Sequence, residues 1–361
     1  MTLFITDGEG PVTKNDNAFE VTAHYIKGPG VDGGRFYSVV SSYDDVLAYV
    51  LKRRGYKAGD TLRLILPFLK AFGATDKGLE RYSQETLLLM PGAKDTLADI
   101  QKKLQVPTYI ISTSYESYVK ALCRIIEFPF NHAYCTRLTI DEYDIINTEA
   151  KNLKKICAEI SSMNIIQVTP EASSLSDFSQ EDQNVIRRLE KIFWEELPQM
   201  KINRLIEEIN PVGGIEKAKA IQQILRKTGS PLSDVIYIGD SITDVESLRM
   251  VREGGGIAVS FNGNAYAVRE ADTAIISSDT QIISLITEVF KQKGRVGILE
   301  FAEDWGKKIK VEHDAFIKLQ NLYQKTLFGF HMVTEENMSE IILQSTSFRK
   351  KVRGEKIGGL G

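Results

Sequence analysis

Apolar runs and helical apolar stripes alternate along much of the chain. The runs predict buried strands near residues 3–6, 107–114, 133–138, 235–239, 257–259 and 273–276. Between the later runs, apolar residues spaced three and four apart predict helices near 93–104, 119–126 and 215–225. Strands that alternate with helices indicate a parallel sheet of about six strands whose crossover connections are helical.

Two stretches interrupt this alternation. Residues 13–42 read as a loop broken by glycines, and apolar stripes at 43–51 and 62–69 then predict helices. We therefore expect a helical segment, 14–88, inserted directly after the first strand, and a second helical insertion at 141–210.

The remaining residues divide between a core and an extension. The core comprises 1–13, 89–140 and 211–295, and 296–361 forms a C-terminal helical extension. Its basic stretch Arg349–Lys356 reads as a frayed, solvated tail. The expected fold class is α/β, with a doubly wound (Rossmann-like) parallel sheet core and two helical insertions.

Composition narrows the class of protein. An apolar content of 43%, a charged content of 26% and a net charge of −3 are those of an ordinary soluble protein and argue against a nucleic-acid-binding surface. No apolar run is long enough to span a membrane. The three cysteines form no CxxC pair and read as reduced thiols. We expect a cytoplasmic protein with neither a nucleic-acid nor a membrane partner, and the oligomeric state stays open.

Side chains suited to chemistry follow the strand ends of the expected core. They are, in chain order, Asp7 with Glu9, Ser112, Lys217 at a helix start, and Asp240 with Asp244. Carboxylates on neighbouring strand ends repel one another unless a cation lies between them, and such oxygen ligands favour Mg²⁺. A hydroxyl and an ammonium aimed at the same point would orient phosphoryl oxygens. The additional carboxylate suggests a nucleophile, because carboxylates form acyl-phosphate intermediates.

These residues carry a resemblance to a known family. The motifs Asp7-Gly8-Glu9-Gly10-Pro11, Ile110-Ile111-Ser112, Lys217 and Gly239-Asp240-Ser241-Ile242-Thr243-Asp244 resemble, in this order, the four motifs of the haloacid dehalogenase superfamily. The resemblance is greatest to the phosphoserine-phosphatase-like branch, whose helical cap follows the first strand. It covers the core but neither the insertion at 141–210 nor the C-terminal region.

The resemblance implies a role for each motif residue. Asp7 would be the nucleophile and a metal ligand. Glu9 would be the general acid and base, and its backbone carbonyl would touch Mg²⁺. Ser112 and Lys217 would bind the phosphoryl oxygens. Asp240 would ligate the metal directly. Asp244 would support the metal site indirectly, without ligating the ion itself, or would orient Lys217.

One departure from the family pattern bears on turnover. The family usually has aspartate two positions after the nucleophile, where this chain has Glu9. The favoured function is a Mg²⁺-dependent phosphatase that hydrolyses a small phosphorylated metabolite through an aspartyl-phosphate. The alternatives are a phosphotransferase or mutase with the same residues, and a catalytically weak protein that binds a phosphate or a partner.

Overall fold

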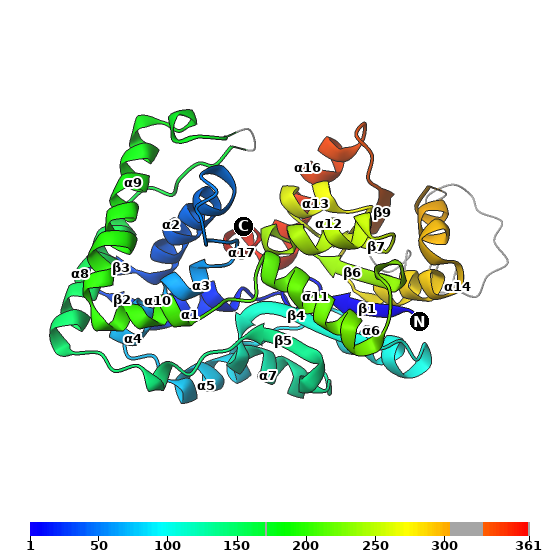
Figure 1. The fold of residues 1–361 in the computed structure, drawn as a ribbon, viewed down its shortest axis with the longest axis horizontal. Helices are drawn as coiled ribbons and strands as arrows, with labels where there is room; N and C mark the ends of the chain where they lie inside the picture. Colours follow the sequence, from blue (N-terminus) through cyan, green and yellow to red (C-terminus); the bar gives the residue numbers. More distant parts are fainter. Residues whose placement is uncertain (170–171, 304–327, 360–361) are drawn as a thin grey trace.

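A computed structural model describes residues 1–169, 172–303 and 328–359, which form a core built on a sheet and a helical lobe beside it (Figure 1). Within these residues the core sheet has seven strands, in the order β5-β4-β1-β6-β7-β8-β9. The strands are β1 (Leu3–Thr6), β4 (Thr108–Tyr115), β5 (Ala133–Thr136), β6 (Val235–Gly239), β7 (Ile257–Phe261), β8 (Thr273–Ser277) and β9 (Phe328–Met332). All neighbouring strands are parallel except β8 and β9.

Helices cover both faces of this sheet. Side chains point alternately to the two faces along β1, so Phe4 joins the hydrophobic cluster on one face and Leu3 and Ile5 join the cluster on the other. The first face is covered by α6 (Ala93–Ala98), α7 (Glu116–Ile125) and α14 (Gln281–Glu303), and the second by α11 (Ile215–Thr228), α12 (Val245–Glu253) and α13 (Ala265–Glu270). The predicted doubly wound α/β core is confirmed.

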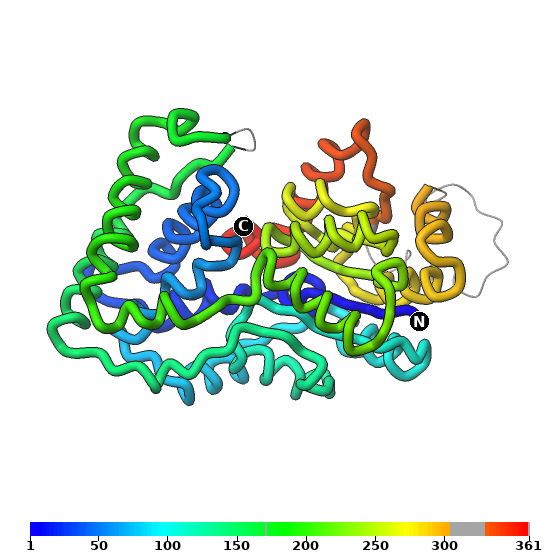
Figure 2. Tube along the Cα trace, viewed as in Figure 1, coloured from blue at the N-terminus to red at the C-terminus, as the bar shows by residue number. Residues whose placement is uncertain are grey.

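The helical lobe, defined here as residues 14–88 and 141–210, contains both predicted insertions. Its elements are α1 (Asn17–Tyr25), β2 (Lys27–Gly28), β3 (Val31–Asp32), α2 (Gly33–Asp45), α3 (Thr61–Leu64), α4 (Leu66–Ala71), α5 (Asp76–Thr86), α8 (Asn147–Ser162), α9 (Gln180–Lys191) and α10 (Arg204–Glu208). One hydrophobic cluster includes Val40 and Leu69 from the first insertion and Leu153 and Ile186 from the second. The two insertions therefore share a core, and Figure 2 shows their traces side by side. The domain boundaries themselves stay predictions.

The loop expected at 13–42 is instead mostly helical. Asp16 caps the start of α1 by accepting a hydrogen bond from the backbone N–H of Phe19, and Asp32 caps α2 through the N–H of Arg35. A Cβ on Gly33 would collide with the carbonyl oxygen of Thr22. This glycine therefore lets α2 start close against the end of α1 and does not break a helix there.

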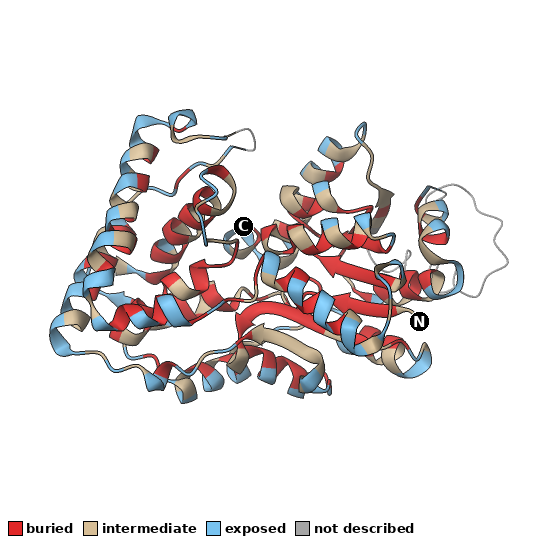
Figure 3. Ribbon diagram, viewed as in Figure 1, coloured by how far each residue is buried: buried red, intermediate tan, exposed pale blue. Residues whose placement is uncertain are grey.

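The C-terminal region differs from its expected form in two respects. It contains a strand, β9, which extends the sheet, and its basic stretch is not a frayed tail. Residues 338–353 form α16 (Met338–Arg353), which is followed by α17 (Glu355–Gly358), and α16 packs on the core through the buried Ile341. In Figure 3, intermediate and exposed residues follow one another along the visible side of α16. Arg349 is only 3% exposed. Within the described residues, no helix has the length and apolar character needed to cross a membrane.

Candidate active site

The turn after β1 places Asp7 at the middle of the sheet. The backbone N–H of Asp7 donates to the carbonyl of Ile238 in β6 at 2.9 Å, and the Asp7 residue is 4% exposed. Gly10 has φ +90°, and a Cβ there would collide with the Asp240 carboxylate. The glycine turn thus allows the acids that follow β1 and β6 to come together. Ligands bind at such carboxyl ends of strands in open α/β sheets.

Lys217 joins two of the predicted acids. Its Nζ donates to Asp7 Oδ2 at 2.6 Å and to Asp244 Oδ1 at 2.8 Å, and the lysine is fully buried. Asp244 Oδ1 also accepts from the Tyr237 hydroxyl at 2.6 Å, and Asp244 Oδ2 accepts from the backbone N–H groups of Asp240 and Ser241. Asp244 therefore orients Lys217 and shapes the turn after β6.

Burial sets the protonation of these groups. It raises the pKa of Asp7 to about 8, against the attraction of the Lys217 ammonium and with help from the nearby Asp244 and Asp240. Burial would also raise the pKa of Asp244, but Lys217 and the donated hydrogen bonds bring it below its ordinary value. The two carboxylates raise the pKa of Lys217, although burial opposes them. The site thus holds a firmly charged lysine against an acid, Asp7, whose charge depends on its surroundings.

An acidic cluster fits a divalent cation. Asp7, Asp240 and Asp244 each offer one carboxylate oxygen, and these oxygens lie within 4.8 Å of one another. Each Asp244 oxygen accepts at least two hydrogen bonds, whereas each Asp7 oxygen accepts one, so we take Asp7 and Asp240 as the pair able to bind the ion. Oxygen ligands of this kind suit Mg²⁺.

Glu9 lies apart from this cluster. Its Oε1 accepts a hydrogen bond from the backbone N–H of Asn17 at 2.7 Å, at the start of α1. Burial and the neighbouring Asp16 raise the pKa of Glu9 well above its ordinary value. The side chain is therefore held on the helical lobe in a form able to donate a proton.

Ser112 lies inside β4 and not at its end. The residue is 1% exposed, and its Oγ packs against Gly8 and accepts from the N–H of Ser114 at 3.3 Å. The next two residues, Thr113 and Ser114, line the cavity described below. The roles assigned to the predicted residues stay proposals.

A cavity of about 90 Å³ lies between the core and the helical lobe. Asp7, Glu9 and Asp240 line it from the core, and Asp45 is among the residues that line it from the lobe. Asp45 also lines a larger cavity, of about 610 Å³, between α2 and α17. The smaller cavity has room for a group with few heavy atoms.

Comparison with known proteins identifies the family. Residues 95–287 match haloacid dehalogenase-like hydrolases, and this stretch is more than half of the 361-residue chain. The chain belongs to this family. The matched stretch contains Ser112, Lys217, Asp240 and Asp244, and Asp7 and Glu9 precede it. The resemblance to the superfamily is thus confirmed. No curated protein matches the chain.

Solved structures similar to this hydrolase include the gene product AF1437 from Archaeoglobus fulgidus. It is 26% identical, with a TM-score of 0.78, and the alignment covers 100% of this chain and 99% of that chain. Phosphoserine phosphatase in its apo form is 11% identical, with a TM-score of 0.46 over 78% of this chain and 96% of that one. A phospho-aspartyl intermediate analogue of phosphoserine phosphatase is 13% identical, with a TM-score of 0.42 over 75% of this chain and 91% of that one.

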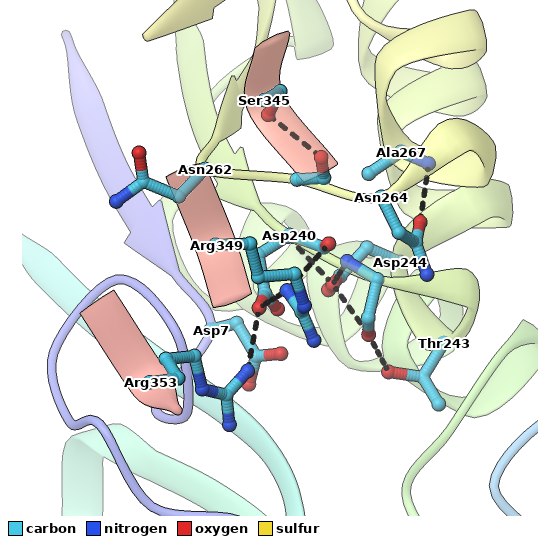
Figure 4. A network of polar contacts seen from close by, with 12 residues as sticks. Asp7, Asp240, Thr243, Asp244, Asn262, Asn264, Ala267, Ser345, Arg349 and Arg353 are labelled. Carbon is cyan, nitrogen blue, oxygen red and sulfur yellow. Dashed lines mark hydrogen bonds and ion pairs between the residues drawn. The ribbon is translucent and has the colours of Figure 1, made fainter. Parts of the chain in front are cut away.

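Sequence reasoning missed two arginines at the site of this hydrolase. Arg349 and Arg353 extend from α16 to the Asp240 carboxylate (Figure 4). Their spacing of four residues, which places them on one face of a helix, is the signal that could have indicated a shared partner. They lie outside the stretch that matches the family.

Proposed function

We propose that this hydrolase is a Mg²⁺-dependent phosphatase that transfers a phosphoryl group from a small phosphorylated metabolite to Asp7 and then to water. The observation that carries the proposal is the buried pair of Asp7 and Lys217, 2.6 Å apart, beside the second acid Asp240. A carboxylate next to a fixed cation and a possible metal site is suited to attack phosphorus. Membership of a hydrolase family supports the same reaction class.

In the first step, an oxygen of ionised Asp7, the form that the Lys217 ammonium favours, forms a bond to phosphorus as the bond to the leaving oxygen breaks. Glu9 gives its proton to that leaving oxygen, and burial, which raises its pKa, favours the protonated form that this step needs. Lys217 stabilises the negative charge that spreads over the phosphoryl oxygens. The metabolite leaves as an alcohol, and Asp7 carries the phosphoryl group.

In the second step, a water molecule attacks the phosphorus of phosphorylated Asp7. Glu9, now ionised, takes a proton from this water, the bond between phosphorus and the Asp7 oxygen breaks, and inorganic phosphate leaves. Asp7 and Glu9 return to their starting forms. A Mg²⁺ ion held by Asp7 and Asp240 would neutralise phosphoryl charge and help align the reacting groups.

Release of nitrophenolate from p-nitrophenyl phosphate tests this proposal. We expect release to require Mg²⁺ and to stop in excess chelator. Asp7→Asn should lower kcat by a factor on the order of 10⁴ or more, because it removes a nucleophile. Asp144→Asn is a matched control, since Asp144 is exposed and away from the site.

Two outcomes contradict the proposal. Full activity in chelator would remove the metal from the mechanism. Activity of Asp7→Asn equal to that of the control would show that Asp7 is not the nucleophile.

A further inference from the structure

Helix α16 brings two buried arginines to the small cavity. The side chains of Arg349 and Arg353 are 4% and 5% exposed, and both contact Asp240 Oδ2, Arg353 at 3.0 Å. The helix is held in place by Ser345, whose hydroxyl donates to the carbonyl of Gly263 at 2.7 Å. Figure 4 shows both guanidinium groups extending toward the acids that follow β1 and β6.

The two arginines use their hydrogen-bond donors differently. Arg353 donates from all three of its nitrogens, to the carbonyls of Lys14 and Asn15 and to Asp240. Arg349 uses one nitrogen, Nη1, which donates to the Asp240 carbonyl at 3.0 Å and to its carboxylate. Its Nε is buried and has no partner among the described residues. Arg353 is therefore fully occupied by the protein, and Arg349 keeps donor capacity.

Two hydroxyls of residues that line the same cavity as Arg349 are also unpaired within the described part of the chain. The Thr113 Oγ1 and the Ser114 Oγ are buried without a hydrogen-bond partner in the described part of the chain. Both residues line the same 90 Å³ cavity as Arg349 and Asp7. A buried donor that lacks a partner destabilises the structure. Three such groups around one cavity therefore indicate a ligand that accepts hydrogen bonds.

The cavity wall carries more acids than bases, so an anionic ligand would need positively charged partners there. The acids that line the cavity are Asp7, Glu9, Asp16, Asp44, Asp45 and Asp240, whereas Arg349 and Arg353 are the lining residues with a positive charge. A phosphoryl group approaching Asp7 would be repelled by this wall unless cations offset it. Guanidinium groups bind phosphoryl oxygens with charge-assisted hydrogen bonds.

We propose that Arg349 binds the phosphoryl oxygens of the substrate together with the hydroxyls of Thr113 and Ser114, and that Arg353 is a positioning residue that fixes the turn after β6. This proposal rests on the phosphatase function proposed above. It is compatible with a metal on Asp240, because the arginines contact Oδ2 and no described residue donates to Oδ1.

Binding of inorganic phosphate in the presence of Mg²⁺, measured by isothermal titration calorimetry, tests the proposal without turnover. Arg349→Gln should weaken phosphate binding about 10- to 100-fold, the loss expected for a charge-assisted hydrogen bond. Arg349→Lys keeps the charge and should recover part of the affinity, because lysine lacks the planar fork. Lys351→Gln, an exposed change of equal charge on the same helix, should bind phosphate like the unmodified protein.

The outcomes separate this proposal from the phosphatase function. Phosphate binding that depends on Arg349, in a protein without phosphatase activity, would support this inference and refute the function. Unmeasurable phosphate binding by the unmodified protein would overturn the inference, and so would an unchanged affinity in Arg349→Gln. An Arg349→Gln variant that binds Mg²⁺ more tightly and phosphate equally well would also overturn it, since Arg349 would then compete with the metal.

Discussion

At the scale of single residues, Glu9 is held in a manner that suits proton transfer. Its carboxyl is fixed by the Asn17 N–H at 2.7 Å, and burial raises its pKa. Asn17 is the first residue of α1 in the helical lobe, so the Glu9 side chain spans from the turn after β1 to α1. The methylene that glutamate has beyond aspartate helps Glu9 to reach this helix.

We expect Glu9→Gln to separate the two steps. Nitrophenolate is a good leaving group, so phosphorylation of Asp7 needs little protonation and should survive. Hydrolysis of phosphorylated Asp7 needs the base and should slow. Rapid mixing with p-nitrophenyl phosphate should give a burst near one equivalent per site followed by a slow rate. Steady turnover at the unmodified rate would show that another group is the acid and base.

The sequence could predict that Asp7, Asp240 and Asp244 lie close together, because these acids follow apolar strands of a parallel sheet. The structure brings them together and adds Lys217 from the start of α11, while their roles stay predictions. Arg349 was missed because its partner, Asp240, is 109 residues away and local patterns show only a basic helix end. The spacing of Arg349 and Arg353 places them on one face of a helix, but it does not show which distant residue they contact.

At the scale of elements, the helical lobe is one packed unit made from two insertions. Leu153 of α8 is fully buried in the cluster that also contains Val40 of α2. Arg35 of α2 donates to the carbonyls of Ser161, at 2.8 Å, and Met163, at 2.9 Å, at the end of α8. Stability should therefore be shared between α2 and α8.

We predict that Leu153→Ala destabilises the lobe by about 2–5 kcal/mol, the usual cost of such a cavity. Hydrogen exchange followed by mass spectrometry should show faster exchange in both α2 and α8. Leu343→Ala on α16 is the control, since Leu343 is 72% exposed. Faster exchange in α8 alone would mean that the two insertions are independent.

The elements of the core were easier to predict than those of the lobe. Core strands are continuous apolar runs and can be recognised from the sequence. Gly33 in the lobe was mistaken for a helix breaker, because its role is to let α1 and α2 pack closely. The strand β9 pairs with β8, although many residues separate the two strands in the sequence, among them 304–327, which lie outside the described residues. Pairing between strands so far apart in the sequence cannot be predicted from local patterns.

At the scale of the whole molecule, buried acids make stability depend on pH. Burial raises the pKa of Asp44 from 3.8 to about 7 and that of Glu20 from 4.5 to about 7. A raised pKa in the folded state means that folding favours the protonated form. The contribution of each protonated acid to the free energy of unfolding is complete below about pH 4 and is lost as the pH rises through 7.

We therefore expect the free energy of unfolding to fall between pH 5 and pH 8. Urea unfolding of the unmodified protein and of an Asp44→Asn, Glu20→Gln double variant should give different slopes against pH. The free energy of unfolding of the double variant should change less with pH. The difference should be on the order of a few kcal/mol for the buried Asp44. Parallel curves would show that these two acids stay ionised in the folded protein.

The position of β1 has a consequence for synthesis of the protein. This apolar strand lies between β4 and β6, which begin at Thr108 and Val235. Ribosomes add about 5–20 residues per second. They therefore reach the first residue of β4 roughly 5–20 s after they complete β1, and the first residue of β6 roughly 10–45 s after it. During that interval both edges of this interior strand are unpaired, and unpaired apolar edges are prone to aggregation. We therefore expect residues 3–6 to be a site of aggregation in the growing chain until their neighbours emerge.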